Sequence, residues 1–191
     1  MVRVILRCMN TSQLMTPARP GLADLLGGIR EQTRRGLDPR RTALAVADVL
    51  RAGMPGPDLL TDEERRGDAD ELVSHLLYAE PAFSVKALIW QPGQLTSIHD
   101  HIAWCAFGVI QGAEYETQYR DDGDHLTEIG RVANEVGDVS GFAPPGDIHR
   151  VHNTGDDTAI SLHVYGADLS ADGISVRREY DLPIRAARSK H

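Results

Sequence analysis

Residues 93–105 read GQLTSIHDHIAWC and residues 137–153 read GDVSGFAPPGDIHRVHN. Because successive side chains of a β-strand point to opposite faces, His99 and His101 lie on the same face of a strand. His149 follows the Pro-Pro-Gly turn of the second stretch, so a later strand can bring a third imidazole to the first two. The two stretches predict a site in which His99, His101 and His149 hold one divalent metal. Imidazole suits iron, zinc, copper and nickel, so these ligands alone do not name the metal.

Other polar residues near these histidines have weaker claims on the metal. His152 is the rival third ligand, but we expect it to face elsewhere if the chain holds His149 inward. Asp100 lies between the first two ligands and points to the opposite face of the strand, where we expect it to anchor a neighbouring backbone or side chain. No partner motif accompanies His75, His125 and His191.

The sequence around the histidines has the pattern of short β-strands. Apolar residues alternate with others from Phe83 to Ile89, and the turn QPGQ follows at 91–94. Later segments are separated by turns rich in glycine and aspartate, such as 121–124 and 155–157. Many short strands between such turns indicate an all-β barrel or sandwich rather than alternating strands and helices.

The N-terminal part of the chain indicates helices instead. Apolar residues recur at helical spacing over 22–29, although a Gly-Gly pair weakens the pattern. Asp38 followed by Pro39 is a good helix start and Gly53 is a good stop, which predicts a second helix over 39–52.

Thr61 and Glu64 have the spacing of a capping box, which predicts a third helix that runs toward Leu77. We expect these helices to form a layer packed on the barrel, within one domain. The expected segments are a helical part over 1–77, the barrel over 78–183 and a flexible tail over 184–191.

Composition limits the possible partners. The chain has 191 residues, of which 41% are hydrophobic and 25% are charged, as in ordinary globular proteins. Its net charge of −8 argues against binding nucleic acid, which depends on Lys and Arg contacts with phosphates. No apolar stretch approaches the roughly 18–20 residues that span a bilayer, and the apolar N-terminus is too short for a signal peptide. Two cysteines give no disulfide framework, so we expect a cytoplasmic protein. We also expect a monomer or small homo-oligomer without a membrane partner.

A third motif lies in residues 159–165, which read AISLHVY. Ser161, His163 and Tyr165 share one face of this apolar strand. Taken alone, they indicate only a core strand with one hydrogen-bonded polar face.

Together the motifs resemble the two-part signature of the cupin superfamily, small double-stranded β-helix (jelly-roll) barrels with a metal in the mouth. In two departures, one extra residue follows Gly137, and Cys105 stands where most cupins place a glutamate ligand. Without that carboxylate, the neutral three-histidine site resembles the thiol dioxygenases, above all the cysteine dioxygenase family. The resemblance covers roughly residues 78–180 and implies a mainly β cupin barrel with an N-terminal helical layer.

The third motif resembles the Ser-His-Tyr relay of the same enzymes. The resemblance implies that Tyr165 is the acid–base group and hydrogen-bond donor, positioned by His163, which Ser161 orients. It also implies Fe(II), because redox-inert zinc cannot supply one-electron chemistry with O2. The expected activity is that of a mononuclear non-haem Fe(II) thiol dioxygenase, which converts a mercaptocarboxylate or cysteine and O2 to the sulfinate. The alternatives are a related iron cupin that oxidises or cleaves another small sulfur compound, and a non-catalytic cupin that binds a metal or ligand.

Two further features stay open at this point. Some members of the family join a cysteine to the relay tyrosine, which implies a thioether between Cys105 and Tyr165; the alternative is a small buried thiol. The family's carboxylate-binding arginine implies Arg177 or Arg178 as substrate ligand, with a solvated arginine pair as the alternative. A cationic substrate would instead meet Glu80, Glu114 or Glu116.

Overall fold

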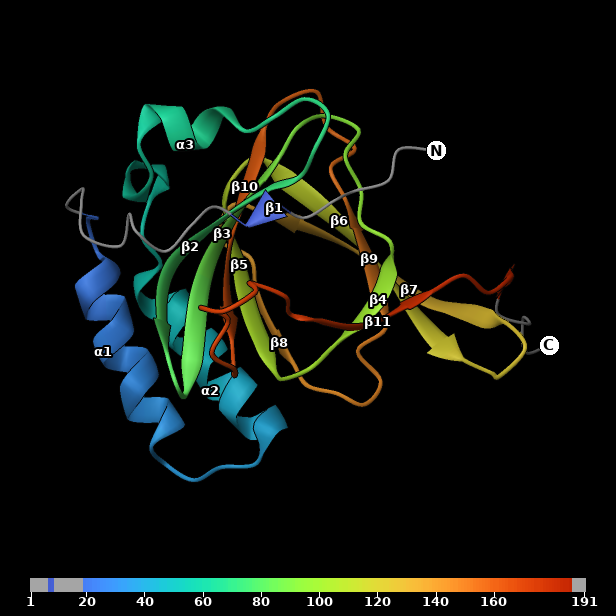
Figure 1. The fold of residues 1–191 in the computed structure, drawn as a ribbon, viewed down its shortest axis with the longest axis horizontal. Helices are drawn as coiled ribbons and strands as arrows, with labels where there is room; N and C mark the ends of the chain where they lie inside the picture. The colour runs from blue at the N-terminus through green and yellow to red at the C-terminus, as the bar shows by residue number, and fades with distance from the viewer. Residues whose placement is uncertain (1–6, 9–18, 187–191) are drawn as a thin grey trace.

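The computed structural model describes residues 7–8 and 19–186, which form two facing β-sheets with helices on one side (Figure 1). The sheet beneath the helices, here the helix-backed sheet, has the strand order β1 (Arg7–Cys8), β2 (Val73–Glu80), β3 (Phe83–Trp90), β10 (Ala159–Tyr165), β5 (Cys105–Gln111) and β8 (Val139–Phe142). The facing sheet, here the open sheet, has the order β11 (Val176–Tyr180), β4 (Ile98–His101), β9 (His149–His152), β6 (Ala113–Asp121), β7 (Leu126–Glu135) and β12 (Ile184–Ala186).

The strand pairing shows how the chain winds. β3 pairs with β10, β4 with β9, β5 with β8 and β6 with β7, and every pair is antiparallel. These are the pairings of one long hairpin whose tip lies between β6 and β7. Two further pairings, β10 with β5 and β9 with β6, coil that hairpin into a barrel. This winding is the double-stranded β-helix of the cupin barrel, so the predicted fold is confirmed.

The apolar residues of β3 recur with a period of two, although the strand is buried on both faces. Its odd-numbered residues, from Phe83 to Ile89, belong to the apolar core beneath the helices. Its even-numbered residues, from Ser84 to Trp90, point the opposite way, into the barrel. All 8 residues are buried, so the polar members of the strand line the interior and not the solvent.

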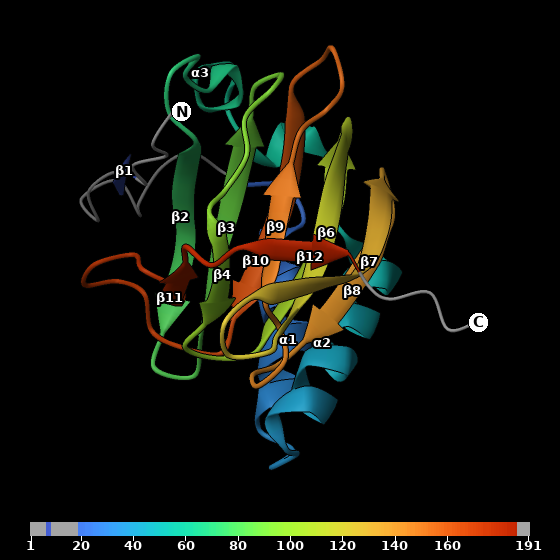
Figure 2. The same cartoon turned by 90° about the vertical axis from the view of Figure 1, so that its right-hand side faces the viewer.

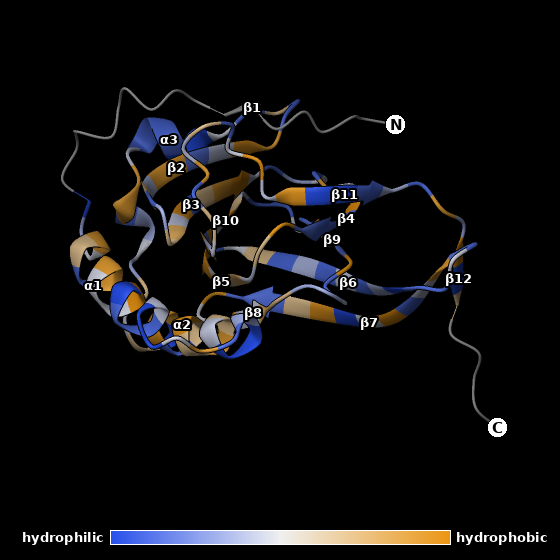
Figure 3. Ribbon diagram, turned by 60° about the horizontal axis from the view of Figure 1, so that its bottom comes forward, coloured by the Kyte–Doolittle hydropathy of each residue, from blue (hydrophilic) through white to orange (hydrophobic). Residues whose placement is uncertain are grey.

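Two predicted helices are confirmed. α1 (Leu22–Thr33) and α2 (Pro39–Gly53) pack on the helix-backed sheet, and each carries both hydrophobic and hydrophilic residues (Figure 3). The Asp38 carboxylate accepts a hydrogen bond from the backbone N–H of Arg41 at 3.0 Å and so caps α2. A single 3-10 turn, η2 (Pro57–Leu59), follows. No helix in residues 19–186 is long and apolar enough to cross a membrane.

The prediction of a third helix toward Leu77 is wrong in its length. The capping box of Thr61 and Glu64 is present, but α3 spans only Asp62–Arg66. Gly67, whose φ is 62°, ends it because glycine tolerates that conformation. The chain then enters β2, where pairing with β3 outweighs local helix signals. The boundary predicted between residues 77 and 78 therefore falls inside a strand.

The C-terminal segment also differs from its prediction. Ile184–Ala186 form β12, which runs parallel to β7, so these three residues are not part of a frayed tail. Residues 187–191, with His191, lie outside the described residues.

Candidate metal centre and its surroundings

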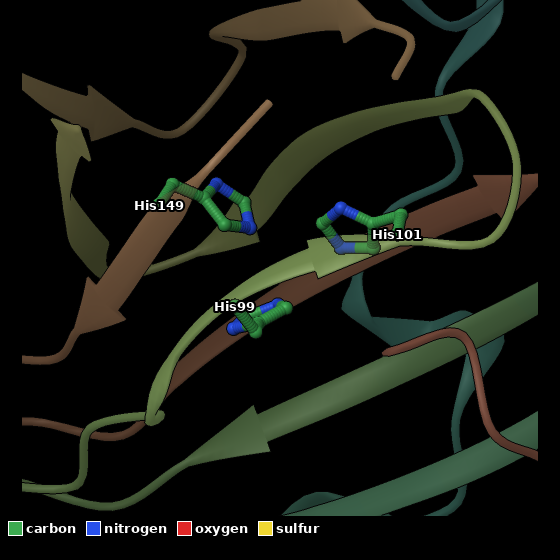
Figure 4. Close-up of side chains that lie close together, drawn as sticks. All are labelled: His99, His101 and His149. Carbon is green, nitrogen blue, oxygen red and sulfur yellow. The ribbon is translucent and has the colours of Figure 1, made fainter. Parts of the chain in front are cut away.

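Three histidine side chains converge inside the barrel. His99 and His101 come from β4, and His149 comes from the start of β9, directly opposite His99. One nitrogen from each ring lies within 4.8 Å of the others, and all three side chains are buried. Figure 4 shows the three rings around a common space. Within the described ranges, His99 and His149 are also the single directly opposed pair between β4 and β9.

Hydrogen bonds fix the direction of each ring. In every case Nδ1 lies at hydrogen-bond distance from an oxygen atom that can only accept, so Nδ1 donates and Nε2 is the ring nitrogen that a metal can reach. The donor–acceptor pairs are His99 with the Ser97 carbonyl (3.0 Å), His101 with the Asp147 carboxylate (3.0 Å) and His149 with the Glu116 carboxylate (2.7 Å). Asp147 also accepts the backbone N–H of His101 at 3.1 Å. The arrangement therefore fixes which atom of each imidazole could act as a metal ligand.

The donor set fits a divalent metal. Burial, followed by the neighbouring His149 and His101, holds the pKa of His99 well below its usual value. Burial likewise lowers the pKa of His101, although the Asp147 carboxylate opposes the shift. Neutral imidazole is the form that binds metals, and three such nitrogens suit iron, zinc, copper or nickel.

The residues that compete with this set lie on the outer face of the open sheet. His152 is three residues beyond His149 on β9, where buried and part-exposed residues alternate, so it faces away from the other histidines as predicted. Asp100 points outward between the two ligands of β4. Its carboxylate accepts hydrogen bonds from Arg177 and from the Tyr180 hydroxyl, the latter at 2.9 Å, which is the anchoring role expected of it.

Arg177 and Arg178 do not reach the histidines, contrary to their predicted role in substrate binding. Strand β11 pairs with β4 so that Arg178 is opposite Asp100, which directs it to the outer face. Arg177 hydrogen-bonds the same carboxylate, and the two arginine side chains are 52% and 53% exposed. Both line a surface cavity of about 350 Å³ that none of the three histidines lines.

The Ser-His-Tyr motif lies across the barrel on β10. His163 Nε2 is 2.9 Å from Ser161 Oγ, and His163 Nδ1 is 3.3 Å from the Tyr165 hydroxyl. The Trp90 indole N–H donates to Ser161 Oγ at 3.0 Å and fixes the far end of the chain of contacts. The Tyr165 ring lies 6.0 Å from the His101 ring, measured between centroids. The motif thus extends from the base of the barrel to the histidines.

The interior of the barrel keeps the relay neutral. Burial, and then the nearby His101 and His149, lower the pKa of His163 to about 3. Burial, and then Cys105, raise the pKa of the Tyr165 hydroxyl well above its usual value. At neutral pH His163 therefore carries one ring proton and Tyr165 keeps its hydroxyl proton.

Cys105 is the immediate neighbour of Tyr165. The two residues are directly opposed on β5 and β10, and both belong to one buried cluster with Phe107 and Leu169. Cys105 Sγ lies 3.9 Å from His163 Nδ1, and burial raises the pKa of the thiol well above its usual value. The placement suits either a buried thiol or a thioether to Tyr165, and the bond itself stays a prediction.

The three glutamates considered for a cationic substrate have different surroundings. Glu80 pairs with Arg30 on the outside of the barrel at 2.9 Å. Glu116 is committed to His149. Glu114 is fully buried, and neither of its oxygens has a hydrogen-bond partner of good geometry among the described residues. Burial raises the pKa of Glu114 to about 7, with a smaller opposing effect of the Ser161 hydroxyl.

The sequence did not reveal that Asp147 and Glu116 accept hydrogen bonds from the histidines, nor that Lys86 is buried. Asp147 and the ligand it holds are 46 residues apart, and Glu116 and His149 are 33 apart, so no local motif joins them. Lys86 occupies one of the positions between the apolar residues of the alternating stretch 83–89, where the sequence pattern gives no sign of burial. A signal for Glu116 was available, since charged residues at inward positions of buried strands are rare unless paired; Asp147 lies in the loop before β9 and carries no such signal.

Three solved structures are similar to parts of this chain. A double-stranded β-helix protein from Klebsiella pneumoniae is 22% identical, with a TM-score of 0.46, over 58% of this chain and 89% of that chain. A cupin superfamily protein from Desulfitobacterium hafniense is 14% identical, with a TM-score of 0.44, over 58% of this chain and 85% of that chain. Oxalate decarboxylase from Bacillus subtilis is 24% identical, with a TM-score of 0.39, over 46% of this chain and 22% of that chain.

The family comparison extends to the site residues. The family described as cysteine dioxygenase type I matches residues 68–172. That range includes the three histidines, Cys105 and the Ser-His-Tyr motif, and it ends before Arg177. Because the match spans more than half of the chain, the chain belongs to the cysteine dioxygenase type I family.

Proposed function

We propose that the protein is an Fe(II)-dependent thiol dioxygenase, which converts a small thiol and O2 to a sulfinate and a proton (R–SH + O2 → R–SO2⁻ + H⁺). The observation that carries the proposal is that a candidate metal site and a hydrogen-bonded Ser-His-Tyr motif lie side by side inside one barrel. Three imidazoles face each other on the open sheet, and a Ser-His-Tyr chain on the helix-backed sheet ends beside them. A barrel that only binds a metal has no need of a buried tyrosine held in this way.

The residues that would hold iron are His99, His101 and His149. When bound there, Fe(II) would supply one-electron chemistry with O2 and a positive charge that favours the thiolate form of the substrate. Asp147 and Glu116 keep the ligand rings oriented, and their carboxylates increase the basicity of the imidazoles.

Tyr165 is the group that handles protons and hydrogen bonds at the reacting end of the barrel. Its hydroxyl keeps its proton at neutral pH, because burial raises its pKa, so it can donate to a bound substrate. His163 holds the phenol oxygen in one place, and Ser161 with Trp90 holds His163. A neutral His163 avoids placing a second cation beside the metal.

The thioether between Cys105 and Tyr165 is a separate part of the proposal. Its formation joins Sγ to a ring carbon and removes the thiol hydrogen and a ring hydrogen, with O2 as the acceptor of both electrons. The two residues face each other across β5 and β10, as this bond requires. Tryptic mass mapping tests it: a crosslinked peptide pair lacking two hydrogens is expected, and two separate unmodified peptides would refute the bond.

The function is tested by O2 consumption and sulfinate production with Fe(II)-loaded protein. The thiols are 3-mercaptopropionate, L-cysteine, cysteamine and mercaptosuccinate, and we expect O2 uptake matched to sulfinate with at least one of them. His149→Ala should lose iron and activity, because two ligands remain. The matched control is His152→Ala, which removes an outward histidine of the same strand and should keep both. Stoichiometric iron without O2 uptake would instead favour a metal- or ligand-binding protein.

A further inference from the structure

Glu114 is a buried acid inside the barrel that the proposed mechanism does not use. It lies on β6, two residues before Glu116, so both carboxyl groups are on the inner face of the strand. Glu114 is fully buried, and neither of its oxygens has a hydrogen-bond partner of good geometry in the part of the chain that the structure describes. Burying a carboxyl group in this way is costly, so the residue calls for a reason.

The carboxyl group of Glu114 stands beside the far end of the Ser-His-Tyr motif. Strands β6 and β10 are in contact across the interior of the barrel, and hydrogen bonding by the Ser161 hydroxyl opposes the effect of burial on the pKa of Glu114. Asn134 is directly opposite Glu114 on β7, and it too is buried with no partner for its side-chain nitrogen among the described residues. The Asn134 amide can therefore donate to one carboxyl oxygen while the other meets Ser161.

The other titratable groups of the interior come from four strands. Glu116, on the same strand as Glu114, bonds His149 of β9. On β5 and β10, burial raises the pKa of Cys105 and of Tyr165 well above their usual values, and the charge of Glu114 acts on both groups. On β3, Lys86 donates to a backbone carbonyl at 2.8 Å. On the inner faces of these strands, within the described ranges, Glu114 is the one carboxyl group without a partner.

Ser161 has a single hydrogen to donate. Its oxygen accepts a hydrogen bond from the Trp90 indole N–H at 3.0 Å, and it lies 2.9 Å from His163 Nε2. A hydroxyl group has one hydrogen and two acceptor lone pairs, so one hydrogen and one lone pair remain for His163 and Glu114. Whichever of these two residues receives the hydrogen, the other must donate to the oxygen.

A protonated Glu114 imposes one direction on the motif. The carboxylic acid donates to Ser161, and Ser161 then donates to His163 Nε2. His163 is neutral and holds one ring proton, which must therefore be on Nδ1 and is donated to the phenol oxygen of Tyr165. The hydroxyl hydrogen of Tyr165 then points away from His163 and is available to a bound substrate.

An ionised Glu114 imposes the opposite direction. A carboxylate can only accept, so Ser161 donates to Glu114 and accepts from His163 Nε2–H. Nδ1 then has no proton and accepts the hydroxyl hydrogen of Tyr165, across an N–O distance of 3.3 Å. The hydrogen that Tyr165 could give to a substrate is now used inside the motif.

We infer that Glu114 is a positioning residue, which sets the direction of the hydrogen bonds in the Ser-His-Tyr motif and, when protonated, leaves the Tyr165 hydrogen available to the substrate. The inference rests on the proposed function where it concerns turnover, whereas the direction of the hydrogen bonds can be measured without it. Burial raises the pKa of Glu114 to about 7, so both directions are populated in the neutral range.

The direct test is the position of the ring proton of His163, read from the nitrogen NMR shifts of the Zn(II)-loaded protein. Zinc suits the three histidines and has no redox chemistry, so no turnover interferes. We expect the proton on Nδ1 at pH 5 and on Nε2 at pH 9, with the change centred at about pH 7. The same His163 tautomer at both pH values would overturn the inference.

Two variants and one control separate Glu114 from other causes. Glu114→Gln cannot ionise, so the His163 tautomer should not change with pH. Ser161→Ala removes the hydroxyl between Glu114 and His163, so it should abolish the response although the acid still titrates. Glu135→Gln, at an exposed position of β7, should respond as wild type does. A response that persists in Glu114→Gln or in Ser161→Ala would overturn the inference. If Glu114→Gln does not fold, Ser161→Ala provides the comparison.

Turnover by the Fe(II)-loaded protein separates this inference from the proposed function. With a saturating thiol that yields sulfinate, kcat of wild type divided by kcat of Glu114→Gln should fall about tenfold from pH 6 to pH 8. The ratio cancels titrations that the two proteins share. A ratio that does not change with pH would overturn the inference and leave the dioxygenase standing. A pH-dependent His163 tautomer in a protein that forms no sulfinate would refute the dioxygenase and support the assigned role of Glu114 in the motif.

Discussion

The two sheets of the barrel hold their functional residues in different ways. Ser161, His163 and Tyr165 stand on the helix-backed sheet, whose opposite face is packed under α1 and α2 through Ile160, Leu162 and Val164. The three histidines that could hold a metal stand on the open sheet, which faces the viewer in Figure 2 and has no covering helix in residues 19–186.

The support of the ligands is therefore polar. Asp147 and Glu116 hold the rings from inside, and the cluster of Asp100, Arg177 and Tyr180 holds β4 from outside. Apolar packing places the relay, whereas hydrogen bonds place the metal ligands. The difference predicts that substitutions on the two sheets change different measured quantities.

The largest expected effect is on turnover, at the relay. Tyr165→Phe removes only a hydroxyl group, and we expect kcat for sulfinate formation to fall by about 10²–10⁴-fold, as for loss of a positioned acid–base group. Iron content and the unfolding temperature should stay at their wild-type values, because Tyr165 is not a ligand. Tyr115→Phe, at a 44% exposed position of β6, is the control and should change none of the three. Loss of iron from Tyr165→Phe would contradict the inference that substitutions on the helix-backed sheet leave metal binding unchanged.

The second effect is on metal affinity, at the open sheet. Asp147→Asn keeps the shape of the acceptor for His101 but removes its charge, so the affinity for Fe(II) or Co(II) should fall by about 10–100-fold. With saturating metal, turnover should recover most of its wild-type value. Metal titration of the apoprotein measures the affinity, and Asp156→Asn in an exposed turn is the control. Unchanged affinity would show that the hydrogen bond does not position the ring.

The smallest effect is on stability, at the acid between the two sheets. Burial raises the pKa of Glu114 from 4.5 to about 7, so the folded state holds a proton that the unfolded state has released. The free energy of unfolding contributed by Glu114 is therefore full below pH 4.5 and is lost as the pH rises through 7. Glu114→Gln cannot ionise and should gain stability relative to wild type from pH 5 to pH 8, by up to roughly 3 kcal/mol.

Urea unfolding of the chelated protein at both pH values measures this gain. The exposed Glu135 of β7 provides the control, Glu135→Gln, for which the difference should not depend on pH. A pH-independent difference for Glu114→Gln would mean that the carboxyl is better solvated, or better paired, than its burial indicates.

Much of the fold and of the site was readable from the sequence, because both follow from local periodicity. The spacing of His99 and His101 fixes one face of a strand wherever that strand lies, and the spacing of Ser161, His163 and Tyr165 does the same. The helix start at Asp38 is likewise a local signal, and it is present as predicted.

The predictions that were wrong concern features that depend on pairing between strands distant in the sequence. The segment before Leu77 has a helix start but becomes a strand because β3 is available beside it. Arg177 and Arg178 were near the site in sequence, but the register of β11 on β4 directs them outward. The burial of Lys86 could not be predicted, because an alternating strand usually has one face in solvent. In β3 that second face lines the interior of the barrel instead.

His99 and His149 are directly opposed on β4 and β9, so a metal bound by both would also stabilise the contact between these two strands. Within the bounds of the two strands only one pair of residues is directly opposed, and both of its members are candidate metal ligands. An ion shared by His99 and His149 would cross-link β4 and β9, because it needs both side chains at once. At 100 times its dissociation constant such an ion adds about 2.7 kcal/mol to stability by mass action. Bound iron would then increase the stability of the folded barrel, and the protein in an iron-starved cell would be less stable as well as inactive.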